Sequence, residues 1–528
     1  MSLARTWAIA LVGLEGHLVE VEADIASGLP KTTLIGLPDA ALTEARDRVR
    51  AAVVNTGEEF PFRKLTIGLS PATLPKAGSH YDLAIACALL GAVGVLPGDR
   101  LYRTALIGEL GLDGRVREIR GTLAMTLAAA AAGFEAIIVP ELNADEAKLV
   151  PGITVFGVRS LRQVLALLRG ADIPDEEPPR AEPRLTSETL TRRIPDLDLA
   201  DVAGQKDGRL ALEVAAAGGH HLFLHGPPGA GKTMLAERLP GLLPDLNTSD
   251  ALEVSAVHSL AGLMSGGGAQ LVTRPPFIAP HHTASLVSLV GGGSGMPRPG
   301  AISCAHRGVL FIDEAAEMHP LTLDTLRQPL ESGMIEIHRA VAVGKFPARF
   351  LLVLAANPCA CGMAGVPGGL CSCSQHTIRR YGERISGPIR DRIDIVRPIL
   401  PSTRADLAGS KDDRESTATV AARVAEARHR QLHRFKGRDW RLNSEVPGPV
   451  LRRDHPPNQA GLEELEEKYA AGKLSARGFD RALRLAWTLA DLANEPQPTR
   501  DTVTTALQLR TGAPLTPPGT HRDIRRSA

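Results

Sequence analysis

The sequence predicts a multidomain α/β protein whose last part is helical. The chain has 528 residues, which is too long for a single hydrophobic core and favours about three domains. In its middle, an apolar strand pattern, a glycine-rich loop and a helix pattern follow one another directly, as they do in the βα units of parallel sheets. Beyond residue 400 the apolar residues recur at helical spacing instead, which favours a region of amphipathic helices.

The first region, residues 1–168, alternates strand and helix patterns. Two neighbouring apolar runs near the N-terminus predict paired strands. Further apolar runs bounded by turn residues predict buried strands, and two segments that end in glycine predict helices. The expected strands lie at 7–14, 16–25, 64–71 and 136–142, and the expected helices at 40–57 and 121–134.

Residues 169–194 are rich in proline and charge and have no periodicity, which predicts a linker. The α/β core is expected over 195–400, the helical region over 401–512 and a disordered tail over 513–528. Individual helices and one strand are also expected within these regions. In the core they are a helix at 208–219, a strand at 221–226 and a helix at 233–243, and in the helical region they are helices at 460–472 and 475–493.

The composition is that of an ordinary globular protein, with 44% hydrophobic and 23% charged residues. A formal net charge of +1 excludes a global basic field, so contacts with nucleic acid would need local patches such as 428–440. Only 3% of residues are aromatic, which argues against a surface built on stacked bases. No run of about 18 apolar residues and no secretory leader are visible, so we expect a cytoplasmic protein without a membrane segment.

The strongest signal is HLFLHGPPGAGKTML, in which an apolar strand, a G-x-x-x-x-G-K-T loop and a helix follow in order. Backbone N–H groups of such a loop bind phosphate, the lysine reaches the β- and γ-phosphates, and the threonine hydroxyl ligates Mg²⁺. The loop therefore predicts binding of a nucleoside triphosphate with Mg²⁺. Its residues are Gly226, Pro227, Pro228, Gly229, Ala230, Gly231, Lys232 and Thr233.

Polar side chains that follow two other apolar runs complete this prediction. The run GVLFI ends in Asp313 and Glu314, and the run FLLVLAA ends in Asn357. Side chains at the carboxyl ends of parallel strands face the ligand crevice. We expect Asp313 to hold Mg²⁺ through water, Glu314 to polarise the attacking water and Asn357 to contact the γ-phosphate. The alternative for the two acids is that they only cap the next helix.

The segment ISGPIRDRIDIV supplies two candidate arginines, Arg390 and Arg392. An arginine from a neighbouring subunit accelerates phosphoryl transfer by about 10³–10⁵-fold in other systems. The simpler interpretation is a surface ion pair with Asp391 or Asp394.

Together these motifs resemble ATPases of the AAA+ class. Within that class, the segments 274–285, 291–314 and 346–362 resemble the magnesium-chelatase-like branch and its ComM family of competence proteins. The resemblance covers nearly the whole chain apart from the linker and the tail. It implies ATP and Mg²⁺ as cofactors and a homo-hexameric ring.

The resemblance also implies roles for single residues. Gly204 and Gln205 match the start of the adenine pocket, and Arg477 in SARGFDR matches a sensor arginine that reads the γ-phosphate within its own subunit. Arg392 matches the arginine finger. Relatives usually have an apolar residue where this chain has Arg390, so either arginine could be the one that inserts.

The segment 333–350 alternates, turns and returns, which predicts a β-hairpin. By resemblance to replicative helicases the hairpin projects into the pore of the ring, where Arg339 and Lys345 would contact DNA phosphates. The alternative is an ordinary hairpin at the edge of a sheet, whose charged residues prevent it from pairing with other chains. In a second insert, the pair His281–His282 is expected to hydrogen-bond its loop rather than to bind a metal.

Residues 74–90 and 108–140 resemble the proteolytic domain of Lon, which implies a ribosomal S5 domain 2-like α+β fold for 1–168. Cleavage would need a Ser–Lys dyad. At the position where Lon carries its serine this chain has His80, with Ser79 beside it. The position of the lysine in Lon falls near Leu123. We therefore expect a Lon-like domain without protease chemistry that serves oligomer assembly or partner docking, with contact to DNA as a further alternative.

Four of the six cysteines lie in NPCACGMAGVPGGLCSC, directly after the third apolar run. Thiolates are soft ligands and four of them suit tetrahedral Zn²⁺, although the Cys-x-Cys spacing is tighter than that of the usual knuckle. A reversible disulfide, free thiols or an iron–sulfur centre are the alternatives. The predicted ligands are Cys359, Cys361, Cys371 and Cys373.

Two classes of function remain from the sequence. The first is an ATP-driven ring motor on single-stranded or branched DNA, which performs helicase work or branch migration in recombination and natural transformation with other recombination proteins as partners. The second is a chelatase-type or chaperone-type remodeller of proteins. The charges of the hairpin favour DNA, while the near-neutral net charge leaves protein open.

Overall fold

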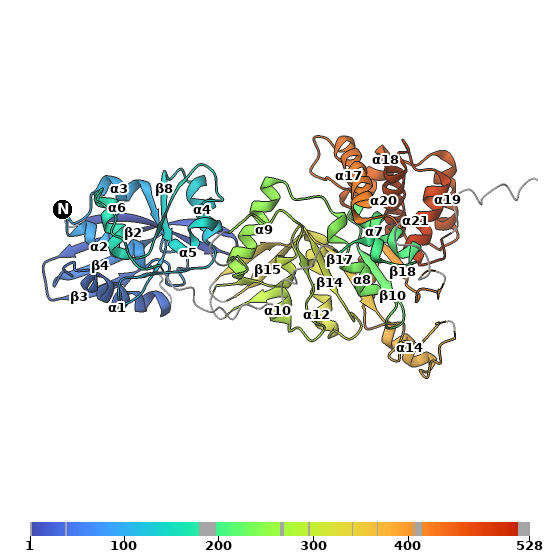
Figure 1. Cartoon of the computed structure of the whole chain (residues 1–528), viewed down its shortest axis with the longest axis horizontal. Coiled ribbons are helices and arrows are strands. Elements are labelled where there is room, and N and C mark those ends of the chain that lie inside the picture. The colour runs from blue at the N-terminus through green and yellow to red at the C-terminus, as the bar shows by residue number, and fades with distance from the viewer. Residues whose placement is uncertain are drawn as a thin grey trace, which may run out of the picture.

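The computed structural model describes residues 3–36, 40–178, 197–264, 269–293, 296–339, 342–366, 368–404, 406 and 414–515. Figure 1 shows a first α/β unit at one end of an elongated chain, a second sheet in the middle and a helical region at the other end. None of the helices in this described part of the chain is long and apolar enough to cross a bilayer.

The first sheet has seven strands in the order β3-β4-β2-β1-β5-β8-β9. Strands β1 and β2 form an antiparallel hairpin with Val12 opposite Glu15. The two-residue turn between them needs a positive φ, which Gly13 supplies at 65°. The strands are β1 (Leu3–Val12), β2 (Glu15–Ala26), β3 (Lys31–Ile35), β4 (Lys64–Ser70), β5 (Thr104–Leu106), β8 (Ala136–Pro140) and β9 (Thr154–Val158).

Helices α1 (Ala40–Asn55), α2 (Asp82–Ala92) and α4 (Thr122–Ala131) pack on this sheet. The two expected helices of this region therefore exist, with ends within three residues of the prediction. The remaining elements are α3 (Gly98–Arg103), the short pair β6 (Glu109–Leu110) and β7 (Val116–Arg117), α5 (Glu141–Ala147) and α6 (Leu161–Arg169).

The expected linker begins directly after α6. Its first residues are held in place, because Gln163 donates to the carbonyl of Pro174 at 2.9 Å and Ser160 donates to Glu176 at 2.8 Å. The rest of the expected linker, 179–194, and the next two residues lie outside the described residues.

The second sheet has five strands in the order β11-β14-β17-β10-β18, all of them parallel. Strands β14 and β17 are buried along their whole length, as expected for a sheet covered on both faces. The strands are β10 (Leu222–His225), β11 (Phe277–Ile278), β14 (Val309–Ile312), β17 (Leu351–Ala356) and β18 (Ile395–Pro398).

The helices of this second unit follow the usual βα order. One of them is shorter than expected: α8 ends at Ala236, and a 3₁₀ turn (η2, Pro240–Leu242) replaces its continuation, because Pro240 has no N–H for a helical hydrogen bond. The helices are η1 (Leu199–Asp201), α7 (Lys206–Gly218), α8 (Lys232–Ala236), α9 (Thr248–Ala261), α10 (Leu286–Val290), α11 (Ala301–Cys304), α12 (Pro320–Asp324), α13 (Arg327–Ser332), α14 (Gln375–Gly382) and α15 (Gly387–Arg392).

Two small hairpins project from this unit and pack against each other. They are β12 (Gly291–Gly292) with β13 (Arg298–Pro299), and β15 (Met334–His338) with β16 (Val343–Pro347). Their contact is close: a Cβ added to Gly344 would lie 2.8 Å from the Cβ of Pro297. The expected hairpin at 333–350 is thus present.

The first unit contacts the second through helix α4, which packs on α9 (Figure 1). The contact is apolar and includes Leu123 and Ala256. At its edge the buried carboxylate of Glu146 accepts hydrogen bonds from the hydroxyl of Ser259 and, at 2.8 Å, from the backbone N–H of Leu123. The turn at Gly13 also lies directly against the backbone of Lys345 in strand β16.

The C-terminal helices share one hydrophobic core with the second sheet. The packed structure extends to Leu515, past the expected start of the disordered tail at residue 513. Arg397 donates to the carbonyl of Ala513 at 2.7 Å, and Leu515 packs on the core. Residues 516–528 lie outside the described part. The helices are α17 (Thr417–Arg434), η3 (Asn443–Glu445), α18 (Gly448–Asp454), α19 (Gln459–Ala470), α20 (Ala476–Ala493) and α21 (Arg500–Thr511).

Candidate functional site

The glycine-rich loop connects the carboxyl end of β10 to α8 at the centre of the second sheet. Gly229 and Gly231 have φ angles of 75° and 95°, which residues with a side chain rarely adopt. A side chain at Gly226 would overlap the carbonyl oxygen of Ile399 on the neighbouring segment. The glycines therefore permit a tight loop of the kind whose backbone N–H groups surround phosphate.

Lys232 is folded into this loop. Its ammonium donates to the carbonyls of Gly226 and Pro227 at 2.8 and 2.9 Å, and to Oδ1 of Asn357 at 3.1 Å. Burial lowers the pKa of Lys232, and the charges of Asp313 and Glu314 partly oppose this effect. A buried cation held by neutral acceptors is poised to exchange them for the oxygens of a nucleotide phosphate.

The predicted magnesium ligands are adjacent in space. The hydroxyl of Thr233 donates to Oδ2 of Asp313 at 2.7 Å, which joins the loop to the end of strand β14. These are hard oxygen ligands of the kind that Mg²⁺ prefers. Because β14 and β17 are parallel neighbours, Asn357 lies at the same edge of the sheet.

Glu314 follows Asp313 with a positive φ of 50°. This left-handed conformation is costly for a residue with a side chain and occurs often at functional sites. It is maintained by two hydrogen bonds, from its own N–H to Oδ1 of Asp313 and from the N–H of Ala315 to the carbonyl of Ala355, both of 2.8 Å. The turn directs the carboxylate of Glu314 toward the crevice.

One histidine of the pair His281–His282 contacts Glu314. His282 Nδ1 lies 2.9 Å from Oε2 of Glu314, and both residues border a cavity of about 230 Å³ together with Thr233 and Asp313. His281 instead contacts the hydroxyl of Thr283 at 2.8 Å, which is the expected loop role. Sequence reasoning missed the contact of His282, because β11 and β14 are brought together only by the sheet.

We expect His282→Ala to lower kcat for ATP about two- to fivefold with little change in KM, because a partly exposed polar contact contributes about 0.2–1 kcal/mol. Its loss frees the carboxylate of Glu314 to rotate without touching the phosphate loop. Steady-state ATPase assays measure both constants, and His281→Ala is the matched control, expected at the parent rate. An equal loss in both variants would mean that only the loop was disturbed.

Gln205 and Gly204 lie beside the phosphate loop. The side-chain amide of Gln205 donates to the carbonyls of Ala230 and Leu400, at 3.0 and 2.5 Å. Gln205 has a positive φ of 54° and precedes the first residue of α7. Gly204, with a φ of 66°, lies against the side chain of Asp406. Gln205 therefore contacts the phosphate loop directly, and Gly204 precedes it in the chain.

Arg392 lies at the other edge of the sheet. Strand β18 runs parallel to β10, with Ile395 opposite Leu222 and Pro398 opposite His225, so that residues before Ile395 lie at the edge opposite the phosphate loop. Arg392 pairs there with Glu331 and donates to the carbonyl of Pro388 at 2.7 Å. No described group accepts a hydrogen bond from its buried Nε.

The other two arginines are held close by. Arg390 donates to the carbonyl of Gly382 at the end of α14. Arg477, on α20, pairs with Asp391 at 3.1 Å. Asp391 and Asp394 thus pair with Arg477 and Arg481 of the helical region, and not with the two candidates for the finger. The contact also places Arg477 at the same edge as Arg392.

The hairpin cations lie on the paired hairpins. Arg339 is exposed at the turn of β15–β16, and its guanidinium approaches Gly292 of the other hairpin. The side chain of Lys345 is 55% exposed and lies 3.5 Å from Glu336. The pairing of Gly292 with Arg298 brings a further exposed arginine, which sequence reasoning missed, to this surface.

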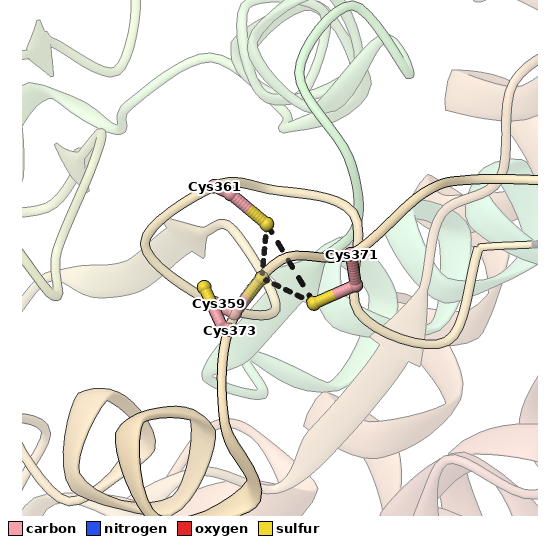
Figure 2. A group of neighbouring side chains, drawn as sticks. All are labelled: Cys359, Cys361, Cys371 and Cys373. Atoms are coloured by element: carbon pink, nitrogen blue, oxygen red, sulfur yellow. Dashed lines mark hydrogen bonds between the residues drawn. The ribbon is translucent and has the colours of Figure 1, made fainter.

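The four clustered cysteines converge. Their sulfur atoms all lie within 4.8 Å of one another, and none forms a disulfide (Figure 2). The backbone N–H of Met363 and the thiol of Cys359 lower the pKa of Cys361 to about 6, which favours its thiolate. The other two cysteines, Cys87 and Cys304, are fully buried, and burial raises their pKa.

The positions that match the protease dyad serve structure here. Ser79 donates to the carboxylate of Glu109, and His80 Nε2 lies 3.0 Å from the carbonyl oxygen of Ile9. Leu123 is fully buried in the contact between α4 and α9. Leu123, near which the resemblance to Lon implied the lysine position, is thus an apolar residue of an intramolecular interface.

Comparison with known proteins agrees with these features. Three family models match the chain: magnesium chelatase subunit ChlI over 198–407, the ChlI subunit of Mg-chelatase over 21–143, and the ChlI C-terminal region over 414–510. The competence protein ComM of Haemophilus influenzae is 39% identical over 500 residues, which cover 94% of this chain and 95% of that protein. The chain belongs to the ComM family of magnesium-chelatase-like AAA+ ATPases.

Other members of the ComM family match the chain as extensively. An uncharacterized protein of Mycobacterium tuberculosis is 53% identical over 514 residues, or 97% of this chain and all of that protein. The uncharacterized protein YifB of Escherichia coli is 40% identical over 511 residues, or 97% of each chain. Lon protease 2 of Bacillus subtilis is 30% identical over 158 residues, 29% of each chain, in accord with a Lon-like part. The family is one of ATPases, which use ATP and Mg²⁺.

Proposed function

We propose that this protein is a ring-forming motor that uses ATP hydrolysis to move on DNA, as a helicase or branch-migration enzyme in recombination and natural transformation. The observation that carries the proposal is the pair of contacting hairpins with Arg298, Arg339 and Lys345 on one projection of the ATPase unit. The name of the Haemophilus relative, a competence protein, supports work on DNA. Such a motor acts in the cytoplasm.

The proposed chemistry of the ATP site follows from its geometry. Lys232 would exchange its carbonyl acceptors for the β- and γ-phosphates, and Thr233 and Asp313 would hold a Mg²⁺ ion, which would neutralise phosphate charge. Glu314, oriented by His282, accepts a proton from the attacking water. We propose that Asn357, which already contacts Lys232, contacts the γ-phosphate.

The site is incomplete within one subunit, which supports a hexameric ring. Arg392 and Arg477 lie at the edge of the sheet opposite their own phosphate loop. We propose that this edge faces the phosphate loop of the next subunit and that both arginines act there. For Arg477 this replaces the role within its own subunit that the resemblance implied. The buried Nε of Arg392 gains an acceptor when a phosphate is present.

The Lon-like unit has a supporting role in this proposal. Its packing on α9 and the position of Gly13 against Lys345 connect it to the hairpin that would contact DNA. We propose that it assembles or aligns the ring and does not cleave peptides. The proposed cofactors are ATP, Mg²⁺ and one structural Zn²⁺ in the four-cysteine cluster, and other recombination proteins are the proposed partners.

The proposal is tested by ATPase rates of the purified hexamer at low salt, with and without single-stranded and four-way-junction DNA. Stimulation by either DNA supports a DNA motor. An enzyme that is active but indifferent to every DNA form would overturn this function and favour a remodeller of proteins.

The double variant Arg339→Ala and Lys345→Ala is expected to lose stimulation by DNA while its rate without DNA persists, because neither side chain contacts the ATP site. Its affinity should fall for all sequences alike. Each lost phosphate contact should also flatten the dependence of log K on log salt by about 0.7–0.9. A salt series of DNA binding measures this slope.

The matched control for this double variant is Arg453→Ala with Lys473→Ala, which removes two exposed cations of the helical region. Its salt slope should equal that of the parent. An equally flattened slope would show that general charge, and not the hairpin, binds DNA.

A further inference from the structure

The sulfur atoms of the cysteine cluster already have the spacing of a single metal site. The distances are 3.3 Å from Cys359 to Cys361, 3.6 Å from Cys361 to Cys371 and 3.9 Å from Cys359 to Cys371 (Figure 2). Four thiolates about 2.3 Å from a tetrahedral Zn²⁺ lie about 3.8 Å apart. The fourth sulfur, that of Cys373, lies within 4.8 Å of the others. One ion accommodates all four sulfurs.

The backbone supports the same interpretation. The N–H of Ala364 points to the sulfur of Cys359 at 3.3 Å, and the N–H groups of Met363 and Ser372 bond the sulfur of Cys361. Hydrogen bonds of this kind orient ligands and stabilise thiolate charge around a metal. Soft thiolates select Zn²⁺ over hard ions such as the Mg²⁺ of the ATP site.

The loop between the two pairs of cysteines has little else to hold it. Cys359 is fully buried, but Leu370 is 94% exposed and Met363 is 36% exposed, so the described residues of the loop, 359–366 and 368–373, form no apolar core of their own. A glycine-rich segment without such a core would lose conformational entropy on ordering without compensation. Binding of an ion to four side chains supplies that compensation.

This loop also rests on the phosphate loop at two points. A Cβ added to Gly362, whose φ is 80°, would lie 2.5 Å from Cδ of Pro228, so only glycine permits the contact. Two residues before Cys359, the side chain of Asn357 accepts the hydrogen bond from Lys232. Both ends of the segment 357–362 are therefore in contact with residues of the phosphate loop.

The other end of the cluster leads to the arginines. Directly after Cys373, the hydroxyl of Ser374 caps helix α14 by accepting from the N–H of Thr377 at 3.2 Å. The last residue of α14, Gly382, accepts the hydrogen bond from Arg390. The cluster thus lies on a short path of chain between the phosphate loop and the segment that carries Arg390 and Arg392.

We propose that the four cysteines bind one Zn²⁺ and that the bound ion braces the phosphate loop through Gly362 and Asn357, so that affinity for ATP depends on the ion. This inference rests on the proposed function only for the assignment of the nucleotide to the phosphate loop. The ion is structural: it contacts neither ATP nor water in the reaction. Removal of the ion loosens the cysteine loop, whose Gly362 packs on Pro228 and which follows Asn357, the acceptor for Lys232.

Metal content tests the first half of the proposal in the full-length protein. Elemental analysis should find one zinc per chain in the parent and in Ser372→Ala, which changes an exposed side chain between two ligands. Cys371→Ser and Cys373→Ser should lose it. Co²⁺ in place of Zn²⁺ should give the visible absorption bands of a tetrathiolate site. Iron with inorganic sulfide, or four freely titrating thiols without metal, would overturn the zinc assignment.

Nucleotide affinity tests the second half. A fluorescent ATP analogue should bind the chelator-treated parent and Cys371→Ser about 10–100-fold more weakly, since small displacements of positioning groups have effects of this size. Adding Zn²⁺ back should restore the parent but not the variant, which separates loss of the ion from irreversible unfolding. Ser372→Ala should bind as the parent does.

Gly362→Ala separates the brace from the ion itself. It keeps all four ligands, so zinc should stay at one per chain, while its methyl group displaces Pro228 and should weaken binding of the analogue about tenfold. Unchanged affinity after zinc removal and in Gly362→Ala would overturn the brace and leave a zinc site. Unchanged affinity in Lys232→Ala would instead overturn the placement of ATP on the phosphate loop.

Discussion

Glu314→Gln is expected to bind ATP with parent affinity and to hydrolyse it about 10²–10⁴-fold more slowly, which is the range for loss of a general base. The amide keeps the size of the carboxylate. The hydrogen bond from the N–H of Glu314 to Oδ1 of Asp313 does not involve the side chain of Glu314. The turn should therefore persist while the proton acceptor is lost. Single-turnover hydrolysis, with binding of an ATP analogue measured in parallel, tests both statements.

Two variants serve as controls for this result. Glu317→Gln removes a carboxylate from the same segment, but Glu317 pairs with Arg384 at 2.8 Å, and its loss should leave hydrolysis near the parent rate. Lys232→Ala should lose binding itself, because its ammonium is the cation of the phosphate loop. Hydrolysis by Glu314→Gln at the parent rate would show that another group accepts the proton.

Arg392→Ala is expected to lower kcat about 10³–10⁵-fold, the range for an arginine supplied by a neighbouring subunit. The residue lies at the edge of the sheet opposite its own phosphate loop, so its loss should harm only the adjoining site of the ring. Mixing Arg392→Ala with inactive Lys232→Ala subunits should restore part of the activity, since some interfaces then combine an intact loop with an intact arginine.

Arg390→Ala is the matched control, because it removes the same side chain two residues away. Arg390 already donates to the carbonyl of Gly382, so we expect a much smaller effect. A larger loss in Arg390→Ala than in Arg392→Ala would identify Arg390 as the finger. Failure of the mixed ring to recover, with assembly verified by light scattering, would contradict action across subunits.

The nucleotide site was the part of this protein most accessible to sequence reasoning. The phosphate loop is one continuous segment, and Asp313 and Asn357 each follow an apolar strand, so chain order alone predicts that they meet at one edge of a parallel sheet. The contacts of Lys232 with Asn357 and of Thr233 with Asp313 are consistent with that prediction. The same reasoning predicted the hairpin at 333–350 from alternation within a single segment.

Contacts between separate segments could not be predicted in this way. His282 was interpreted as a loop residue because no motif near it in the chain predicts that Glu314 is its partner. Arg477 matched a sensor of its own subunit, while its pair with Asp391 depends on how the helical region packs on the sheet. Gly362 gave no signal, since its close approach to Pro228 joins two loops more than 100 residues apart.

The sequence by itself determined the class of the protein and predicted the residues of its candidate ATP site, because both depend on residue types at fixed spacing within continuous strand, loop and helix patterns. Only the tertiary structure decided which edge of the sheet carries the arginines, that the four sulfurs converge on one point, and that the cysteine loop rests on the phosphate loop. The physical reason is that these relations are set by sheet register and packing between distant segments, where a shift of one residue would change every partner.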